Sequence, residues 1–245
     1  MMLAIHELGM PQGTLEEFLN VLRRPNGILL VTGPAGCGKT TTLNAALAEI
    51  KDRADRIIAG EIRDLETAAM AIQASLTGHL VLSTLRHTNK AASSVTHLID
   101  MGIDPFLITS TLEGIMGQRL VRTICTLCKI PYPYPTKEEL AHFGMTRSEV
   151  SDLTFLIGKG CRDCGQTGYE GRMGIFEFLA VSEPIRDLIL NRASAEEIND
   201  KAIEEGMQTM RWDGWLKICM GLTTFEEVVG QIPSTEDGST ELAEV

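Results

Sequence analysis

The segment GPAGCGKT, residues 33–40, constrains the fold of this chain more than any other feature. It fits the pattern G-x-x-x-x-G-K-[ST], and it follows the apolar run Gly27–Thr32, which is typical of a buried parallel strand. A helix is expected from Lys39 to Ile50. Strand, glycine-rich loop and helix together predict a phosphate-binding loop, whose backbone N–H groups surround the anion. A chance match in a glycine-rich turn is the alternative, and the flanking strand and helix disfavour it.

Each position of this loop has an expected role. The Lys39 ammonium is expected to reach the β and γ phosphates of a nucleotide, and the Thr40 hydroxyl to bind Mg²⁺. The helix that follows directs the positive end of its dipole at the same anion. Cys37 occupies a variable position, where we expect a small filler; a redox role is the alternative. The expected nucleotide-binding residues are Gly33, Pro34, Ala35, Gly36, Cys37, Gly38, Lys39, Thr40 and Thr41.

An acidic turn follows a second apolar segment. The run RIIAG, residues 56–60, reads as a short strand and continues into Glu61 and Asp64. A carboxylate at the carboxyl end of a parallel strand faces the ligand crevice of an α/β sheet. There it could hold Mg²⁺ through water or orient an attacking water molecule. On these residues alone, a solvated turn remains an open alternative.

Strands and helices alternate along the first half of the chain. We expect strands at 79–84 and 119–124 and helices at 65–76, 91–101 and 106–116, and the box T-L-E-E at Thr14 is expected to begin a helix before the loop. This alternation predicts an α/β fold with a parallel sheet and helices on both faces. Arg119 and Arg122, near the end of the sheet, are either arginine fingers for a neighbouring subunit or surface ion-pair partners.

Two C-x-x-C pairs stand at Cys125/Cys128 and Cys161/Cys164, with 32 residues between them. Four thiolates at this spacing predict a tetrahedral Zn²⁺ site, which is structural because it has no open coordination position. Disulfides or plain buried thiols are the alternative. We expect IPYPYP, residues 130–135, to be irregular because of its prolines. From Pro184 onward the chain reads as helical, with capping boxes that begin at Ser194 and Thr223.

Composition argues against some classes of function. The net charge of −11 and the aromatic content of 5% argue against a nucleic-acid partner, which needs a basic face or stacking platforms. No apolar run reaches the ~18–20 residues of a membrane span, and the first residues lack the features of a signal peptide. We therefore expect a cytoplasmic chain. The polar, acidic segment 233–245 is expected to be a disordered tail.

Four sequence runs, taken together, form a highly specific pattern. The runs RPNGILLVTGPAGCGKTTTLNAAL, GEIRDLETAAMAIQASLTGHLVLSTL, MGIDPFLITSTLEGIMGQRLVR and GCRDCGQTGYEGRMGIFEFL occur in order between residues 7 and 230. In these runs the chain resembles the C-terminal domain of type II secretion and type IV pilus assembly ATPases. The resemblance implies a RecA-like P-loop core that uses ATP, Mg²⁺ and Zn²⁺. It also implies a ring-shaped homo-hexamer that works with inner-membrane platform proteins at the cytoplasmic side of that membrane.

The resemblance assigns further roles to particular residues. Residues 33–41 become the Walker A loop, Glu61 the Walker B glutamate, and His79 the first histidine of a His box at 77–89, near the γ-phosphate. The expected catalytic set is Glu61, His79 and Lys39. The expected divisions are a RecA-like core at 1–124, a Cys₄ metal-binding subdomain at 125–174, a helical subdomain at 175–232 and the tail at 233–245.

Three departures from the family pattern bear on activity. A strand and an acidic box that the family keeps between Walker A and Walker B have no counterpart here. Residues 51–55 mark the position where that segment would be expected. Arg86 is inserted in the His box and displaces His87 by one position. The N-terminal domains of full-length members are also expected to be missing. Because the lost strand belongs at the sheet edge, we expect the fold to persist, ATP binding to survive and hydrolysis to be weak or absent. A nucleotide-binding remnant is the alternative function.

Overall fold

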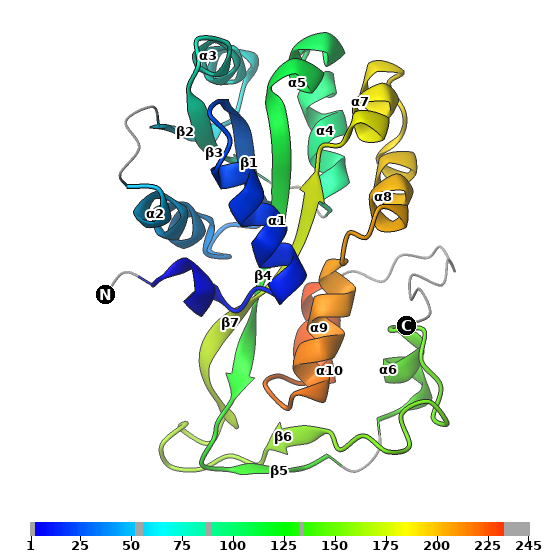
Figure 1. Cartoon of the computed structure of the whole chain (residues 1–245). Coiled ribbons are helices and arrows are strands. Elements are labelled where there is room, and N and C mark those ends of the chain that lie inside the picture. The colour runs from blue at the N-terminus through cyan, green and yellow to red at the C-terminus, as the bar shows by residue number, and fades with distance from the viewer. Residues whose placement is uncertain (1–2, 52–55, 87–89, 133–134, 233–245) are drawn as a thin grey trace. The chain divides into compact units, whose positions relative to one another are not determined.

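The computed structural model describes residues 3–51, 56–86, 90–132 and 135–232 (Figure 1). The chain divides into two compact units. The sheet unit comprises Met1–Arg119 and Phe176–Thr209, and the cysteine unit comprises Leu120–Ile175 and Met210–Val245. This division differs from the boundaries expected from sequence, because two long strands, β4 (Leu112–Ile124) and β7 (Tyr169–Ala180), each contribute residues to both units.

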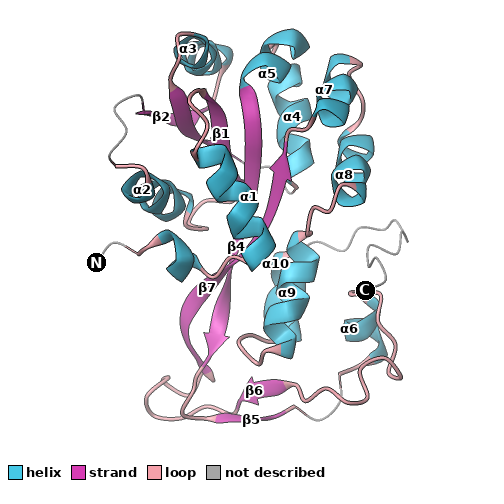
Figure 2. Ribbon diagram, viewed as in Figure 1, coloured by secondary structure: helices cyan, strands magenta, loops and turns pink. Residues whose placement is uncertain are grey.

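The other elements follow the chain in an alternating order. The strands are β1 (Gly27–Gly33), β2 (Arg56–Ile62), β3 (Leu80–Arg86), β5 (Lys129–Pro131) and β6 (Leu156–Gly158). The helices are η1 (Ile5–Leu8), α1 (Gln12–Leu22), α2 (Lys39–Glu49), α3 (Leu65–Leu76), α4 (Ala91–Asp100), α5 (Pro105–Thr111), α6 (Lys137–Ala141), α7 (Glu183–Leu190), α8 (Ala195–Glu204), α9 (Met210–Cys219) and α10 (Phe225–Gln231). Figure 2 shows the same elements by type.

The sheet unit is built on a five-stranded sheet in the order β2-β3-β1-β4-β7. Strand β1 lies at its centre and pairs in parallel with β3 on one side and β4 on the other. All seven residues of β1 are buried, as its uninterrupted apolar sequence predicts. Strand β2 forms one edge and pairs in parallel with β3. The predicted α/β class with a mainly parallel sheet is therefore confirmed.

Helices cover both faces of this sheet, and alternate residues of β1 supply the two cores. Leu29 and Val31 pack with residues of η1, α1 and α2, whereas Ile28 and Leu30 pack with α3, α4, α5, α7 and α8. This period of two is what a strand buried on both faces requires. In the core that contains Leu29 and Val31, Phe18 of α1 makes an edge-to-face contact with Phe178 of β7, with ring centroids 5.6 Å apart.

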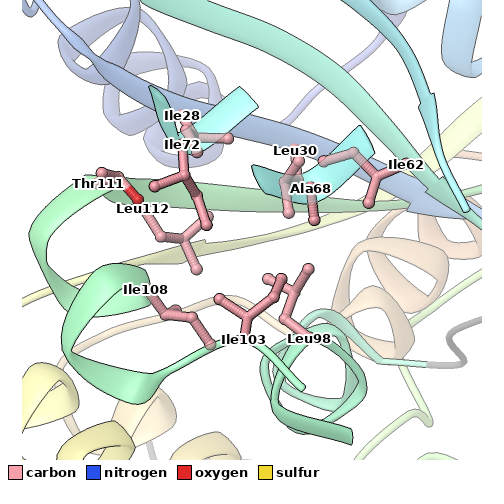
Figure 3. Close-up of a pocket in the computed structure, with 10 residues that line it drawn as sticks. All are labelled: Ile28, Leu30, Ile62, Ala68, Ile72, Leu98, Ile103, Ile108, Thr111 and Leu112. Carbon is pink, nitrogen blue, oxygen red and sulfur yellow. The ribbon is translucent and has the colours of Figure 1, made fainter. Parts of the chain in front are cut away.

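A small cavity lies between the sheet and helices α3–α5, and its apolar lining is drawn in Figure 3. Its volume of about 20 Å³ is about what one water molecule requires. Thr111 supplies a hydroxyl to the lining, but that hydroxyl donates to the Leu107 carbonyl at 2.7 Å. We interpret the cavity as a packing defect of the core.

The cysteine unit has an aromatic core of its own. Phe143 and Phe155 each lie against both Trp215 and Phe225, which also contact each other, with ring centroids 5.0 to 6.1 Å apart. Beside them Lys217 is buried, and its ammonium binds the Asp213 carboxylate at 2.6 Å and the Gly174 carbonyl at 2.8 Å. Burial of a charge is tolerated there because both partners are present.

Several helices and strands begin or end at other residues than the sequence predicted. Helix α1 begins at Gln12, so Thr14 lies inside it, and the cap before α10 is Thr224 where Thr223 was expected. The expected helix at 106–116 is wrong beyond Thr111, because β4 starts at Leu112. Short apolar runs do not distinguish strand from helix. Residues 130 and 131 of the proline-rich run, expected to be irregular, belong to β5 and pair with β6. The expected tail at 233–245 lies outside the described residues.

Candidate nucleotide-binding site

The loop between β1 and α2 has the backbone geometry of a phosphate cradle. Gly33, Gly36 and Gly38 have φ angles of 143°, 77° and 92°, in the region that favours glycine. A Cβ on Gly33 would lie 2.3 Å from the Gln118 carbonyl oxygen, so this position has no room for a side chain. Glycine at these positions lets the loop fold tightly at the carboxyl end of β1.

The Lys39 ammonium lies over this loop. It donates to the carbonyl oxygens of Gly33 at 2.8 Å and Pro34 at 3.0 Å. Thr40 and Thr41, in the first turn of α2, are exposed. Gly38 precedes α2 and has no side chain to cap the first N–H groups, which leaves the positive end of the helix to an anion. The residues expected to bind nucleotide and Mg²⁺ are therefore contiguous at one end of the sheet.

Cys37 is 3% exposed inside the loop, and burial raises the pKa of its thiol. A reactive cysteine needs an exposed thiol with a lowered pKa, so the geometry favours the filler role over the redox role.

Behind the loop, three polar side chains are buried. Gln118 of β4 is 3% exposed and contacts both the loop and α2. Arg119 is 6% exposed, and burial lowers the pKa of its guanidinium. Glu177 of β7 is 4% exposed and accepts from the backbone N–H of Ala91, the first residue of α4, at 2.5 Å. Arg119 is therefore buried away from the surface, where its charge interacts with that of Glu177.

Arg122 forms a surface ion pair, which was one of its two expected roles. Its guanidinium donates to the Glu227 carboxylate at 2.6 and 2.8 Å and lies 4.0 Å from the centroid of the Tyr169 ring. Hydrogen bonding to Glu227 raises the pKa of Arg122.

Glu61 lies near the carboxyl ends of the parallel strands, as the phosphate loop does. It is in register with Thr84 of β3, which is in register with Val31, two residues before Gly33. Its carboxylate accepts from Arg63 at 2.6 Å and is 19% exposed. Asp64, in the same turn, caps α3 by accepting from the Thr67 N–H at 2.8 Å, and that bond lowers the pKa of Asp64. Of the two carboxylates in the turn, Asp64 therefore has a structural role in the helix.

His79 does not lie where the sequence suggested. It precedes β3, whose first residue, Leu80, is in register with Gly27 at the beginning of β1. Six residues of strand separate this point from Gly33, about 20 Å at about 3.3 Å per residue. The His79 ring instead contacts the Ala74 carbonyl at 3.2 Å, at the end of α3. The structure therefore corrects the placement of His79 near the γ-phosphate; His87 lies outside the described residues.

The four cysteines form a separate cluster in the cysteine unit. Their Sγ atoms all lie within 4.8 Å of one another. A tetrahedron with Zn–S bonds of about 2.3 Å has S–S edges of about 3.8 Å. Three of the pairs approach this length, at 3.7, 3.9 and 4.0 Å. Donation from the backbone N–H of Cys161 and from that of Gly168 lowers the pKa of Cys164 to about 6. The cluster fits a Cys₄ metal ion.

Sequence reasoning missed Gln118 and Glu177. Both lie at the carboxyl end of the sheet and near Gly117: a Cβ there would lie 2.8 Å from the Glu177 side chain. For Gln118 the available signal was its position beside Arg119 in the largely apolar run LEGIMGQRL, residues 112–120, which was divided between a helix and a strand. For Glu177 it was a single carboxylate within the apolar run GIFEFL, residues 174–179.

A loop of this geometry between a central parallel strand and a helix defines a P-loop nucleotide-binding protein. The chain belongs to the family described as Type II/IV secretion system protein, whose profile matches residues 1–54 and 48–230. It is 40% identical to the Type II secretion system ATPase E of Vibrio cholerae and 38% identical to the type IV pilus assembly ATPase PilB of Thermus thermophilus, each over 93% of this chain. It spans 52% and 30% of the length of these relatives.

Solved structures share the fold. The pilus retraction motor PilT, solved with bound ADP, superimposes with a TM-score of 0.65 at 22% identity, over 97% of this chain and 68% of its own. The ATPase DotB of Legionella pneumophila gives 0.62 at 19% identity, over 92% and 64%.

The comparisons also locate a gap inside this chain. The alignment with the Vibrio cholerae ATPase has 269 positions, but 93% of 245 residues is about 228. About 41 positions of the relative therefore have no counterpart here. The two matches to the family profile meet at residues 48–54, which places the gap immediately before β2, where the sequence predicted a missing segment.

Proposed function

We propose that this chain is the ATP-binding motor subunit of a type II secretion or type IV pilus assembly machine, in which ATP hydrolysis drives pilin or pseudopilin assembly. The phosphate loop carries the proposal, because its three glycines and Lys39 form a nucleotide cradle within a family whose named members are ATPases. The chain spans only part of these relatives, so the machine that it serves is inferred from them.

Each residue of the site has a proposed task. The loop N–H groups and Lys39 would hold the phosphates, and Thr40 would contribute a hydroxyl ligand to Mg²⁺. When bound, Mg²⁺ neutralises charge on the β and γ phosphates. Glu61, at the end of β2, would orient the attacking water by accepting a hydrogen bond from it. His79 receives no task, because the register of β3 places it far from the loop.

We further propose that the Cys₄ cluster holds a structural Zn²⁺ and that the chain works as a ring of copies at the cytoplasmic face of the inner membrane, through platform proteins. Support comes from the Sγ geometry and from relatives that belong to secretion and pilus machines. Within the described residues, no helix is both long and apolar enough to cross a membrane.

Glu61→Gln is expected to lower the rate of phosphate release from Mg·ATP by about 100-fold or more, because it removes a group that positions water. The affinity for ATP should change by less than about threefold, since the phosphates are held by the loop. Steady-state phosphate release and fluorescent-nucleotide titration measure the two effects. The matched control is Glu66→Gln in the first turn of α3, an exposed carboxylate that should leave both values unchanged.

The same assay tests the alternative of a nucleotide-binding remnant. We expect the wild-type chain to turn over slowly, because the relatives keep about 41 positions that this chain lacks. Release that is measurable and lost in Glu61→Gln supports the motor. Tight binding with no release above the Glu61→Gln level would identify a remnant, and no described contact favours that outcome.

A further inference from the structure

We infer that Gln118 is a positioning residue for the phosphate loop: its side-chain amide fixes the peptide between Cys37 and Gly38 so that the Gly38 N–H faces the bound phosphate. The inference rests on the proposed nucleotide binding and assigns a role to a residue of β4, outside the loop itself. It follows from two short, buried hydrogen bonds.

The first step is the geometry of the amide. Gln118 Nε2 donates to the Cys37 carbonyl oxygen at 2.6 Å, and Gln118 Oε1 accepts from the Thr42 hydroxyl at 2.7 Å. Gln118, Cys37 and Thr42 are 3%, 3% and 0% exposed. Since all three are buried, loss of either bond would leave a buried polar group without its partner, which is unfavourable.

The second step concerns the direction of the peptide. In a trans peptide the C=O and the following N–H point in opposite directions. Because the Cys37 carbonyl points toward Gln118, the Gly38 N–H points away from β4. A phosphate cradle needs its N–H groups turned inward and its carbonyls turned outward. Gln118 supplies the donor that an outward, buried carbonyl requires.

The third step is that the Cys37 carbonyl, which can only accept, fixes which way the amide faces. If the Gln118 amide were flipped, its oxygen would face the Cys37 carbonyl oxygen, and two acceptors would be in contact. The Cys37 carbonyl therefore selects the orientation that places Nε2 toward the loop, and the Thr42 hydroxyl donates to Oε1 on the other side of the amide. Thr42 lies one turn into α2, so the three residues connect β4, the loop and the helix in one network.

The fourth step is the closeness of the packing. A Cβ on Gly38 would lie 2.8 Å from Gln118 Nε2, which shows that the amide is in direct contact with the loop backbone. A shorter side chain at residue 118 would not reach Cys37. A carboxylate would reach it but would place an acceptor against a carbonyl.

The test compares Gln118→Met, which keeps length but loses both hydrogen bonds, with the wild-type chain. Isothermal titration with tripolyphosphate and with Mg·ATP should show affinities weakened by about tenfold, because the Cys37–Gly38 peptide is free to turn. Gln118→Glu should weaken both further, through repulsion of the carbonyl. Gln73→Met, at an exposed position of α3, is the matched control and should bind as the wild type does.

Thr42→Val measured alone gives a result that does not depend on how well the Gln118 variants fold. It deletes one hydroxyl and should weaken tripolyphosphate binding about threefold, with little further loss when added to Gln118→Met. Additive effects of the two changes, or Gln118→Met binding equal to wild type, would overturn the inference. A wild-type chain that binds neither ligand would overturn the proposed function, and the inference with it.

Discussion

Replacing Lys39 with alanine is expected to abolish measurable binding of Mg·ATP, with a dissociation constant raised at least about 100-fold. The half-buried ammonium, held by the carbonyls of Gly33 and Pro34, is the positive charge at the mouth of the loop. Charge-assisted bonds to phosphate oxygens are about twice as strong as neutral ones, and loss of one buried partner costs about 2–5 kcal/mol. Fluorescent-nucleotide titration measures the change.

The control for this prediction is Lys137→Ala, an exposed lysine at the start of α6 in the cysteine unit. It should leave nucleotide affinity unchanged. Circular dichroism of Lys39→Ala should match the wild type, because within the described part of the chain the ammonium bonds to loop carbonyls and not to the core. Unaltered affinity in Lys39→Ala would mean that residues 33–41 do not bind nucleotide.

What the sequence predicted well is local. The phosphate loop follows from eight consecutive residues, and its glycines appear at the positive φ angles that the pattern requires. Helix α3 matches the expected 65–76, because Asp64 caps its start and its apolar residues repeat with helical spacing. The Cys₄ cluster was predictable because thiol spacing alone indicates a metal site.

What the sequence missed depends on register and on distant contacts. His79 was placed near the phosphates because it belongs to a motif, but the register of β3 with β1 places it at the opposite end of the strand. Gln118 and Cys37 are 81 residues apart in the chain, and only the pairing of β4 with β1 brings them together. Neither the separation of His79 from the loop nor the contact between Gln118 and Cys37 follows from the local pattern of apolar residues.

Removal of the metal from the Cys₄ cluster is expected to unfold the loops that carry Cys125, Cys128, Cys161 and Cys164, here called the cysteine loops. The aromatic core of the same unit should stay folded. The loops have few apolar residues of their own, and structural Zn²⁺ contributes about 10–16 kcal/mol in small zinc-binding peptides at pH 7. After treatment with a zinc chelator, hydrogen exchange should accelerate at Cys125, Lys159 and Gln166, whose N–H groups bond within the loops. Protection in α9, which contributes Trp215 to the aromatic core, should persist.

The double variant Cys161→Ser/Cys164→Ser tests the same site without a chelator. Its zinc content, measured by metal analysis, should fall from about one ion per chain to near zero, since two thiolates do not complete a tetrahedral site. Cys219→Ser, a half-buried cysteine outside the cluster, is the control and should retain the metal. Zinc near zero in wild-type protein purified without chelators would contradict the site. Exchange that accelerates equally in α9 would instead show that the metal supports the whole cysteine unit, because the loops and the aromatic core would then unfold together.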